Sequence, residues 1–267
     1  MLSKRQILAL GLSSSSLLAC RETAPVSGSQ LQIHNGVEIG AEHYPAVVLL
    51  MRVAGDTKSY CTGVFINEFQ ALTAAHCVGS PDTDELFLMQ ASSAAAGPAY
   101  EVRSKAHAIH IHPDYAPGPA KLQTHDLALI DFPAGVADDH LELAQEPLAP
   151  NQEVTLVGFG SAQMKPGLHA ATTPDRKRLG TNVIRSIEGG MHTLFGLHQT
   201  AKVEAGKHVS SCAGDSGSPW LVDDKITSLT VGADMVTQSN GTYAPISYAV
   251  DLTSQSNQDF LSTWIDD

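Results

Sequence analysis

The hydrophobic positions of this chain fall in short runs that turn residues interrupt. Glycine and proline are frequent, with 22 and 14 copies. No long stretch repeats apolar residues at the i, i+3, i+4, i+7 spacing of an amphipathic helix. Short apolar runs bounded by turn residues are typical of strands joined by tight loops. The pattern therefore predicts an all-β protein.

The first 20 residues follow a different pattern. Lys4 and Arg5 precede a short apolar run, and four serines then lead to Leu17-Leu18-Ala19-Cys20. This is the layout of a secretory signal, and the apolar run is too short to span a membrane as a stable anchor. The last four residues resemble the bacterial lipoprotein cleavage box, in which the cysteine becomes the lipidated first residue.

We therefore expect residues 1–19 to be a signal peptide and Cys20 to be lipidated. Residues 20–32 are polar and rich in small residues, as in a tether or short propeptide. The protein would then be exported and lipid-anchored to a bacterial membrane, and Arg21 favours the outer membrane in diderm bacteria. The alternative is an ordinary signal peptide with an incidental Cys20, in which case the protein is secreted.

Composition limits the classes of function. Apolar residues make up 43% of the 267 positions, enough for one substantial domain or two small ones. Only 16% of residues are charged, which excludes a disordered chain or a coiled coil. The formal net charge is −12, without a Lys/Arg stripe, so nucleic acid is not an expected partner.

Three segments carry candidate chemistry, in the order His, Asp, Ser. They are Cys61-Thr-Gly-Val-Phe-Ile66 followed by Leu72-Thr-Ala-Ala-His-Cys77, His125-Asp-Leu-Ala-Leu-Ile130, and Ser211-Cys-Ala-Gly-Asp-Ser-Gly-Ser-Pro219. A serine hydroxyl is a weak nucleophile and needs a base within hydrogen-bond reach. His76 can take the Ser216 proton, Asp126 can fix the imidazole tautomer, and the Gly214 and Ser216 N–H groups can bind an oxyanion.

Together these segments closely resemble the signatures of trypsin-like serine peptidases, over about residues 33–267. Val154–Gly160 resembles the family's strand ending in Gly-Trp-Gly, and Phe260–Ile265 its C-terminal helix. The resemblance implies two six-stranded antiparallel β-barrels, over about 33–147 and 148–267, with the active site between them. It implies an endopeptidase that forms an acyl-enzyme on polypeptide substrates, with no cofactor. A monomer is expected.

The resemblance also implies an activation step. Ile33-His-Asn-Gly36 resembles the family's mature N-terminus, whose ammonium inserts beside the residue matching Asp215 after cleavage. Gln32 stands where the family usually has Arg or Lys, which argues against self-activation of the trypsin type.

The cysteines follow the family in part. The resemblance implies a disulfide between Cys61 and Cys77. The family partner of Cys212 lies in a later loop, and no cysteine follows residue 212, so Cys212 is expected to remain a thiol.

Specificity follows from counting along the resemblance. Ser210 falls at the base of the primary pocket, where trypsin has an Asp, and an uncharged base disfavours burial of Lys or Arg. Ala233 and Ile246 fall where wide pockets have glycines. We expect cleavage after small or medium aliphatic residues, unless Ile246 points into the core.

Other readings of the same residues are weaker. No metal is expected at His107, His110 and His112, because no Cys or carboxylate pattern completes a site. The acidic residues from Asp82 to Glu85 do not match an EF-hand. A non-catalytic homologue that binds a partner is the main alternative function. A glutamyl endopeptidase would need a His where equal spacing puts Thr230.

Overall fold

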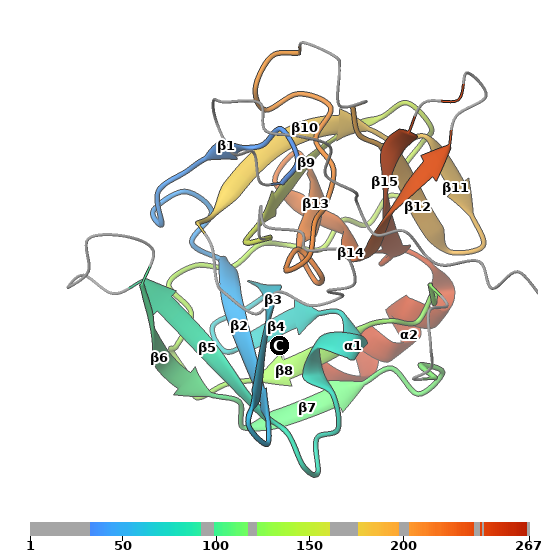
Figure 1. Cartoon of the computed structure of the whole chain (residues 1–267). Coiled ribbons are helices and arrows are strands. Elements are labelled where there is room, and N and C mark those ends of the chain that lie inside the picture. The colour runs from blue at the N-terminus through green and yellow to red at the C-terminus, as the bar shows by residue number, and fades with distance from the viewer. Residues whose placement is uncertain are drawn as a thin grey trace, which may run out of the picture.

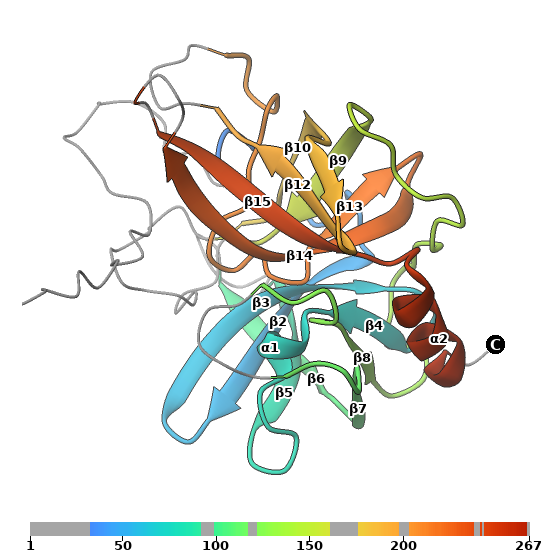
Figure 2. The same ribbon diagram turned by 90° about the vertical axis from the view of Figure 1, so that its right-hand side faces the viewer.

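Two antiparallel sheets, each curled, make up the body of the molecule (Figures 1 and 2). The computed structural model describes residues 33–91, 99–116, 122–160, 176–197, 203–237, 241 and 243–265. The predicted signal peptide, tether and Cys20 lie outside this part of the chain. Among the described residues, no helix has both the length and the apolar character needed to cross a membrane.

The first sheet holds the histidine and aspartate motifs. Its strands run in the order β6-β5-β2-β3-β4-β8-β7, with bounds β2 (Val47–Ala54), β3 (Thr57–Phe65), β4 (Gln70–Thr73), β5 (Glu85–Ala91), β6 (Tyr100–Lys105), β7 (Ala108–Ile111) and β8 (Ala128–Asp131). The short helix α1 (Ala75–Val78) follows β4.

The second sheet holds the serine motif. Its order is β1-β10-β9-β13-β14-β15-β12-β11, with bounds β1 (Val37–Glu38), β9 (Glu153–Gly158), β10 (Arg178–Val183), β11 (Ser186–Glu188), β12 (Met191–Phe195), β13 (Pro219–Val222), β14 (Lys225–Thr237) and β15 (Tyr243–Asp251). The helix α2 (Gln255–Trp264) ends the fold.

One hydrophobic core extends across the two sheets. Leu50 and Leu129 of the first sheet belong to the same buried cluster as Val157 and Leu229 of the second. Each fully buried leucine contributes about 1.5–3 kcal/mol relative to an exposed one. A smaller cluster around Trp220 fills the second sheet alone. The shared core fixes the edge at which loops from both sheets meet.

Helix α2 follows the last strand of the second sheet and returns to the first (Figure 2). Phe260 and Leu261 are buried in the shared core. The Gln70 amide donates to the carbonyl of Trp264 at 2.9 Å, and the Trp264 ring stacks on His110 with centroids 4.0 Å apart. The helix therefore ties the C-terminal end of the chain to the first barrel.

The predicted all-β class with two barrels and a C-terminal helix is confirmed, with differences in detail. The described sheets contain seven and eight strands rather than six each, because short strands such as β1 and β11 extend them. Strand β1 lies in the range predicted for the first barrel, yet it pairs with β10 of the second sheet. Helix α2 begins at Gln255, five residues before the segment from which it was predicted.

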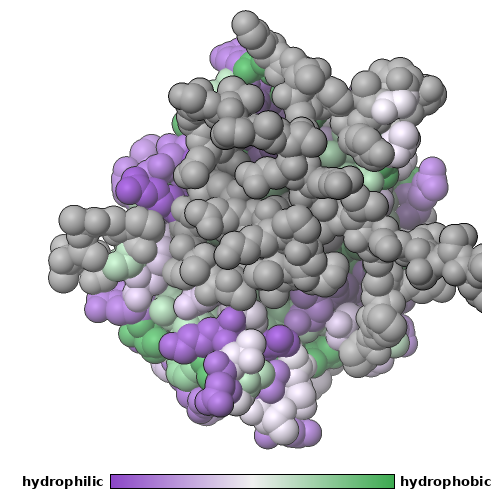
Figure 3. Space-filling model, in the orientation of Figure 1, coloured by the Kyte–Doolittle hydropathy of each residue, from purple (hydrophilic) through white to green (hydrophobic). Residues whose placement is uncertain are grey.

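Exposed apolar side chains are scattered over the surface. Large ones among the described residues, such as Val102 on β6 and Val183 on β10, come from separate elements. Hydrophilic and hydrophobic residues are interspersed over the described surface at the bottom of Figure 3. Scattered apolar residues of this kind are ordinary on a protein surface.

Candidate active site

His76 and Asp126 are held together by two hydrogen bonds. The His76 ring Nδ1 lies 2.7 Å from Asp126 Oδ2, and the His76 backbone N–H donates to Asp126 Oδ1 at 2.9 Å. Asp126 is 6% exposed, whereas the His76 ring reaches the surface. A carboxylate accepts hydrogen bonds only, so Nδ1 carries the proton and Nε2 keeps its lone pair. His76 can therefore act as a base toward solvent.

A disulfide fixes the helix that carries His76. Cys61 on β3 is bonded to Cys77 on α1, with Cα atoms 6.1 Å apart, as predicted. A loop of this length contributes about 3 kcal/mol in the chain-entropy model. Cys212 is a thiol outside this disulfide.

The serine loop of the second barrel rests directly on the first barrel. The N–H of Thr62, next to Cys61, donates to the carbonyl of Ser216 at 2.9 Å, and the Thr62 hydroxyl donates to the carbonyl of Gly214 at 2.9 Å. Gly217 has φ +82°, and a Cβ there would overlap the carbonyl of Thr62. The glycine therefore permits the approach that places the Ser216 carbonyl 3.8 Å from the sulfur of Cys77, the neighbour of His76. No hydrogen bond joins Ser216 to His76 in the described part of the chain.

The loop presents two unused backbone donors. Neither the Gly214 N–H nor the Ser216 N–H donates to an acceptor among the residues that the structure describes. Gly214 has φ +98°, a conformation that glycine adopts at little cost. Backbone N–H groups are rarely left without acceptors inside proteins, so this pair suits a ligand that carries negative charge.

Asp215 lies beneath this loop and is fully buried. Its two carboxylate oxygens accept the N–H groups of Gly160 and Cys212, both at 2.8 Å. Burial raises the pKa of Asp215 to about 7, against the opposing effect of these two bonds. A Cβ at Gly158 or Gly160 would overlap the carboxylate, which explains the Gly-Phe-Gly sequence.

Ile33 lies in the second barrel, as Asp215 does. It is 1% exposed and packs in the cluster around Trp220. The next residue, His34, exchanges two backbone hydrogen bonds with Ser210, at 2.8 and 3.2 Å. The segment that begins at Ile33 is therefore joined to the predicted base of the substrate pocket.

Of the predicted pocket residues, Ala233 and Ile246 lie on the neighbouring strands β14 and β15, whereas Ser210 lies outside the strands, in an isolated bridge with His34. Ser210 is fully buried, and its hydroxyl has no hydrogen-bond partner among the described residues. Ile246 is 7% exposed on β15, and Ala233 on β14 is exposed. Gly196, which sequence reasoning missed, packs so closely that a Cβ there would meet the Ser210 hydroxyl at 2.6 Å. In the sequence, the glycine at position 196 is the feature that points to this close contact.

The histidines on and beside β7, which were the candidates for a metal site, make other contacts. His110 lies 3.0 Å from Asp131. His112, Asp114 and His125 place ligand atoms within 4.8 Å of one another. The rings of His112 and His125 are stacked, however, with 15° between their planes. An imidazole binds a metal through a lone pair in its ring plane, so one ring would have to turn before both could reach one ion.

The fold and this site define a two-barrel serine hydrolase of the chymotrypsin type. A family model described as Trypsin matches residues 33–253. A trypsin from Saccharopolyspora erythraea is 24% identical over 205 residues, which cover 74% of this chain and 85% of that protein. A chymotrypsin from Phaedon cochleariae is 27% identical over 75% of this chain and 72% of that protein.

Two solved structures share the fold. Neuropsin, a serine protease of mouse brain, has a TM-score of 0.58 at 19% identity, covering 86% of this chain and 96% of that one. A Glu endopeptidase has a TM-score of 0.55 at 14% identity, covering 90% and 94%. The chain belongs to the trypsin family and is a serine endopeptidase.

Proposed function

We propose that His76, Asp126 and Ser216 form the catalytic triad of an exported endopeptidase. The observation that carries this proposal is the 2.7 Å bond between His76 Nδ1 and Asp126 Oδ2, in the same barrel whose strand β3 holds the serine loop through Thr62. This bond leaves Nε2 as the base that Ser216 requires.

The chemistry then follows from the geometry. Ser216 Oγ attacks the substrate carbonyl carbon while its proton passes to His76 Nε2. The N–H groups of Gly214 and Ser216 stabilise the oxyanion. His76 returns the proton to the leaving amine as the C–N bond breaks. Water, activated by the same base, then hydrolyses the acyl-enzyme and restores Ser216.

Activation is proposed to follow cleavage between Gln32 and Ile33. The new ammonium at Ile33 would pair with the buried Asp215 carboxylate, which has no cation within ion-pair distance among the described residues. An unpaired buried carboxylate is costly, so pairing stabilises the loop that carries Gly214 and Ser216.

Specificity for small or medium aliphatic residues is proposed from Ser210, Ala233 and Ile246. The buried Ser210 hydroxyl offers no charge to a Lys or Arg side chain. Thr230 supports the case against a glutamyl endopeptidase, because it is 1% exposed and its hydroxyl lies 2.9 Å from both Ser218 and Trp220. Cleavage of peptides that differ only in the residue before the scissile bond tests this specificity. A preference for Arg, Lys, Glu or an aromatic residue at that position would refute the proposal.

For localisation, we propose a monomer anchored to the bacterial membrane through lipid on Cys20, by the signal-like sequence of residues 1–20. Replacement of Cys20 by Ala should release the protein from membranes. Release of the unaltered protein in the same fractionation would favour plain secretion.

The experiment that tests the enzyme is labelling with a fluorophosphonate. Cleaved wild-type protein should take up one label per chain on Ser216, and the Ser216→Ala variant should take up none. Folded, cleaved protein that takes up no label would instead favour the non-catalytic binding homologue.

A further inference from the structure

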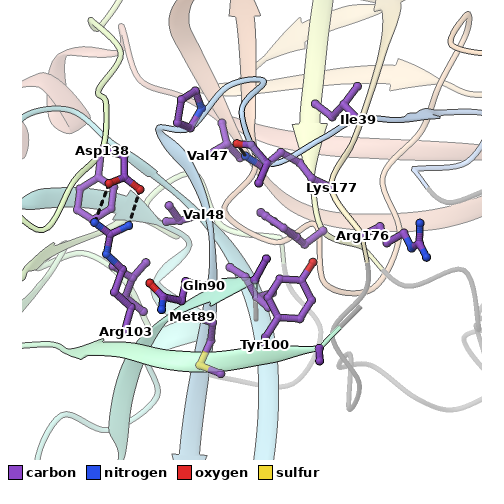
Figure 4. A pocket seen from close by; sticks show the side chains of 18 of the residues that line it. Ile39, Val47, Val48, Met89, Gln90, Tyr100, Arg103, Asp138, Arg176 and Lys177 are labelled. Carbon is purple, nitrogen blue, oxygen red and sulfur yellow. Dashed lines mark hydrogen bonds and ion pairs between the residues drawn. The ribbon is translucent and has the colours of Figure 1, made fainter. Parts of the chain in front are cut away.

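A cavity of about 340 Å³ lies between the two barrels, apart from the candidate active site. Strands β2, β5 and β6 supply one side, and Ile39, Phe159 and Lys177 supply the other. None of His76, Asp126 and Ser216 lines it. Figure 4 shows Arg103 and Asp138 at one end, with Ile39, Lys177 and Arg176 at the other. Its size lies at the lower end of the range for small-molecule sites, about 300–1,000 Å³.

The cavity wall is mixed, and its apolar part suits the hydrocarbon part of a ligand. Val47, Val48 and Met89 face it from the first barrel. The ring of Tyr100 meets the ring of Phe159 edge to face, with centroids 6.1 Å apart. Removal of an alkyl chain from water into such a wall is favourable by about 0.8 kcal/mol per CH₂.

Lys177 is the unusual group in this wall. It is 6% exposed, and its ammonium donates to the carbonyls of Tyr44, His43 and Ala41 at 2.9, 3.1 and 3.4 Å. Burial lowers the pKa of Lys177 to about 8. The nearby Glu42 carboxylate favours the charged form of Lys177, but no carboxylate among the described residues lies within ion-pair distance of the ammonium. A buried ammonium with no carboxylate in contact favours an anionic ligand.

The other cations that line the cavity already have partners. Arg103 is paired with Asp138, and Arg176 with Glu38. The charge available to a ligand is therefore that of Lys177, and a carboxylate would displace its longest bond, at 3.4 Å to the Ala41 carbonyl.

The cavity is connected to the oxyanion loop through Phe159. The side chain of Phe159 lines the cavity, and its backbone N–H donates to the Thr62 hydroxyl at 3.1 Å. The same hydroxyl donates to the Gly214 carbonyl. The next residue, Gly160, donates to Asp215 at 2.8 Å. A ligand that packs on the Phe159 side chain thus contacts a residue whose own backbone is bonded to Thr62. The neighbouring Gly160 is bonded to Asp215, so both bonds support the oxyanion loop.

We propose that this cavity is a regulatory site for a small amphipathic carboxylate, with its hydrocarbon part between the barrels and its carboxylate at Lys177. A ligand stabilises the conformation that contains its site. In this structure that conformation also has Gly160 bonded to Asp215, so occupancy favours an ordered oxyanion loop. By linkage, a covalent inhibitor on Ser216 should tighten binding of the ligand. The regulatory effect rests on the proposed role of that loop, whereas binding does not.

Calorimetry with octanoate and octanol on the mature protein tests the binding. Octanoate should bind at least 10-fold more tightly than the neutral octanol. Lys177→Gln should abolish this preference, and Val48→Phe, which fills the cavity, should weaken both ligands. Lys58→Gln, an exposed lysine on β3, is the matched control and should change neither. The preference should also fall as pH rises through 8, because Lys177 then loses its charge.

Equal affinity for octanoate and octanol would overturn the proposal, as would a preference that survives in Lys177→Gln. If Lys177→Gln fails to fold, Val48→Phe and the two ligands still decide the matter. Strong octanoate binding that Val48→Phe leaves unchanged would place the ligand elsewhere and overturn the proposal as well.

The coupling is measured separately, as the rate of fluorophosphonate labelling at Ser216. Saturating octanoate should raise this rate two-fold or more in the wild type and not in Val48→Phe. Binding without any change in rate overturns the regulatory role. If Ser216 is not labelled under any condition, the proposed function fails, and the calorimetric result is unaffected by that failure.

Discussion

In the first barrel, the candidate site is held by side-chain bonds, whereas in the second it is held by backbone bonds around a buried carboxyl group. His76 is fixed by Asp126 at 2.7 Å and by the disulfide of Cys77. Ser216 depends on a loop that surrounds Asp215, whose pKa is raised to about 7 by burial. Under the proposed activation, the first half does not change when the chain is cleaved, whereas the second half depends on what neutralises Asp215.

The largest expected effect tests whether the two halves act as one unit. His76→Ala and Ser216→Ala should each lower kcat/KM by at least about 10⁴-fold, and the double variant should be no worse than either. The thermal unfolding midpoint of Ser216→Ala should stay close to that of the wild type. Multiplicative losses in the double variant would mean that the halves contribute independently, contrary to the triad.

Cleavage before Ile33 should affect only the part of the candidate site that the second barrel supplies, the loop of Gly214 and Ser216. A Gln32→Arg chain cut with trypsin should be about 10²–10³-fold more active on an aliphatic substrate than an uncut Gln32→Ala chain, the range for loss of an oxyanion donor. Both forms should retain the Cys61–Cys77 disulfide. Equal activity of the cut and uncut forms would refute the proposed pairing of Ile33 with Asp215.

The cut form should also respond to alkaline pH. A free α-amino group titrates near 7.7–8.0, and pairing with a carboxylate raises its pKa. The stabilisation from this pair is fully present at lower pH and is lost as pH rises through the raised value. Activity of the trypsin-cut Gln32→Arg chain should therefore decline on the alkaline side, and the decline should accompany loss of oxyanion-loop order.

A smaller effect concerns the stability of the uncut chain. Because burial raises the pKa of Asp215 from 3.8 to about 7, the folded state binds more protons than the unfolded state between these values. The contribution of Asp215 to stability is therefore fully present below pH 3.8 and is lost as pH rises through 7. Asp215→Asn should remove this part of the pH dependence, measured as the difference between the denaturation midpoints of the two uncut chains. An unchanged profile would contradict the raised pKa.

The sequence predicted the parts of the site whose chemistry demands particular residue types. A nucleophile, a base and a carboxylate cannot be replaced freely, so His76, Asp126 and Ser216 stand in recognisable local motifs. Thr62 carried no such signal, since its hydroxyl joins Phe159 and Gly214 across 97 and 152 residues of chain. Lys177 carried no such signal either, because its burial depends on carbonyls more than 130 residues away. Contacts of this range come from the fold rather than from local spacing.

The smallest expected effect concerns Arg52, which supports the first half in a way the sequence did not suggest. Arg52 on β2 donates to the carbonyl of His76 at 3.4 Å, and its Nε lies 3.8 Å from Asp84. Gly79, with φ +67°, packs against this pair so closely that a Cβ there would overlap Asp84. The two opposite charges therefore hold the chain that follows His76, and we expect them to act on its imidazole in opposite directions.

Removal of one charge at a time should shift the acidic limb of the kcat/KM profile in opposite directions. Arg52→Gln leaves the Asp84 charge, which favours the imidazolium, so the limb should move up by about half a pH unit. Asp84→Asn leaves the Arg52 charge, so the limb should move down by a similar amount. The double variant should return close to the wild-type profile. A purely structural role would lower kcat in all three variants without opposite shifts, and that result would refute an electrostatic effect of this pair on His76.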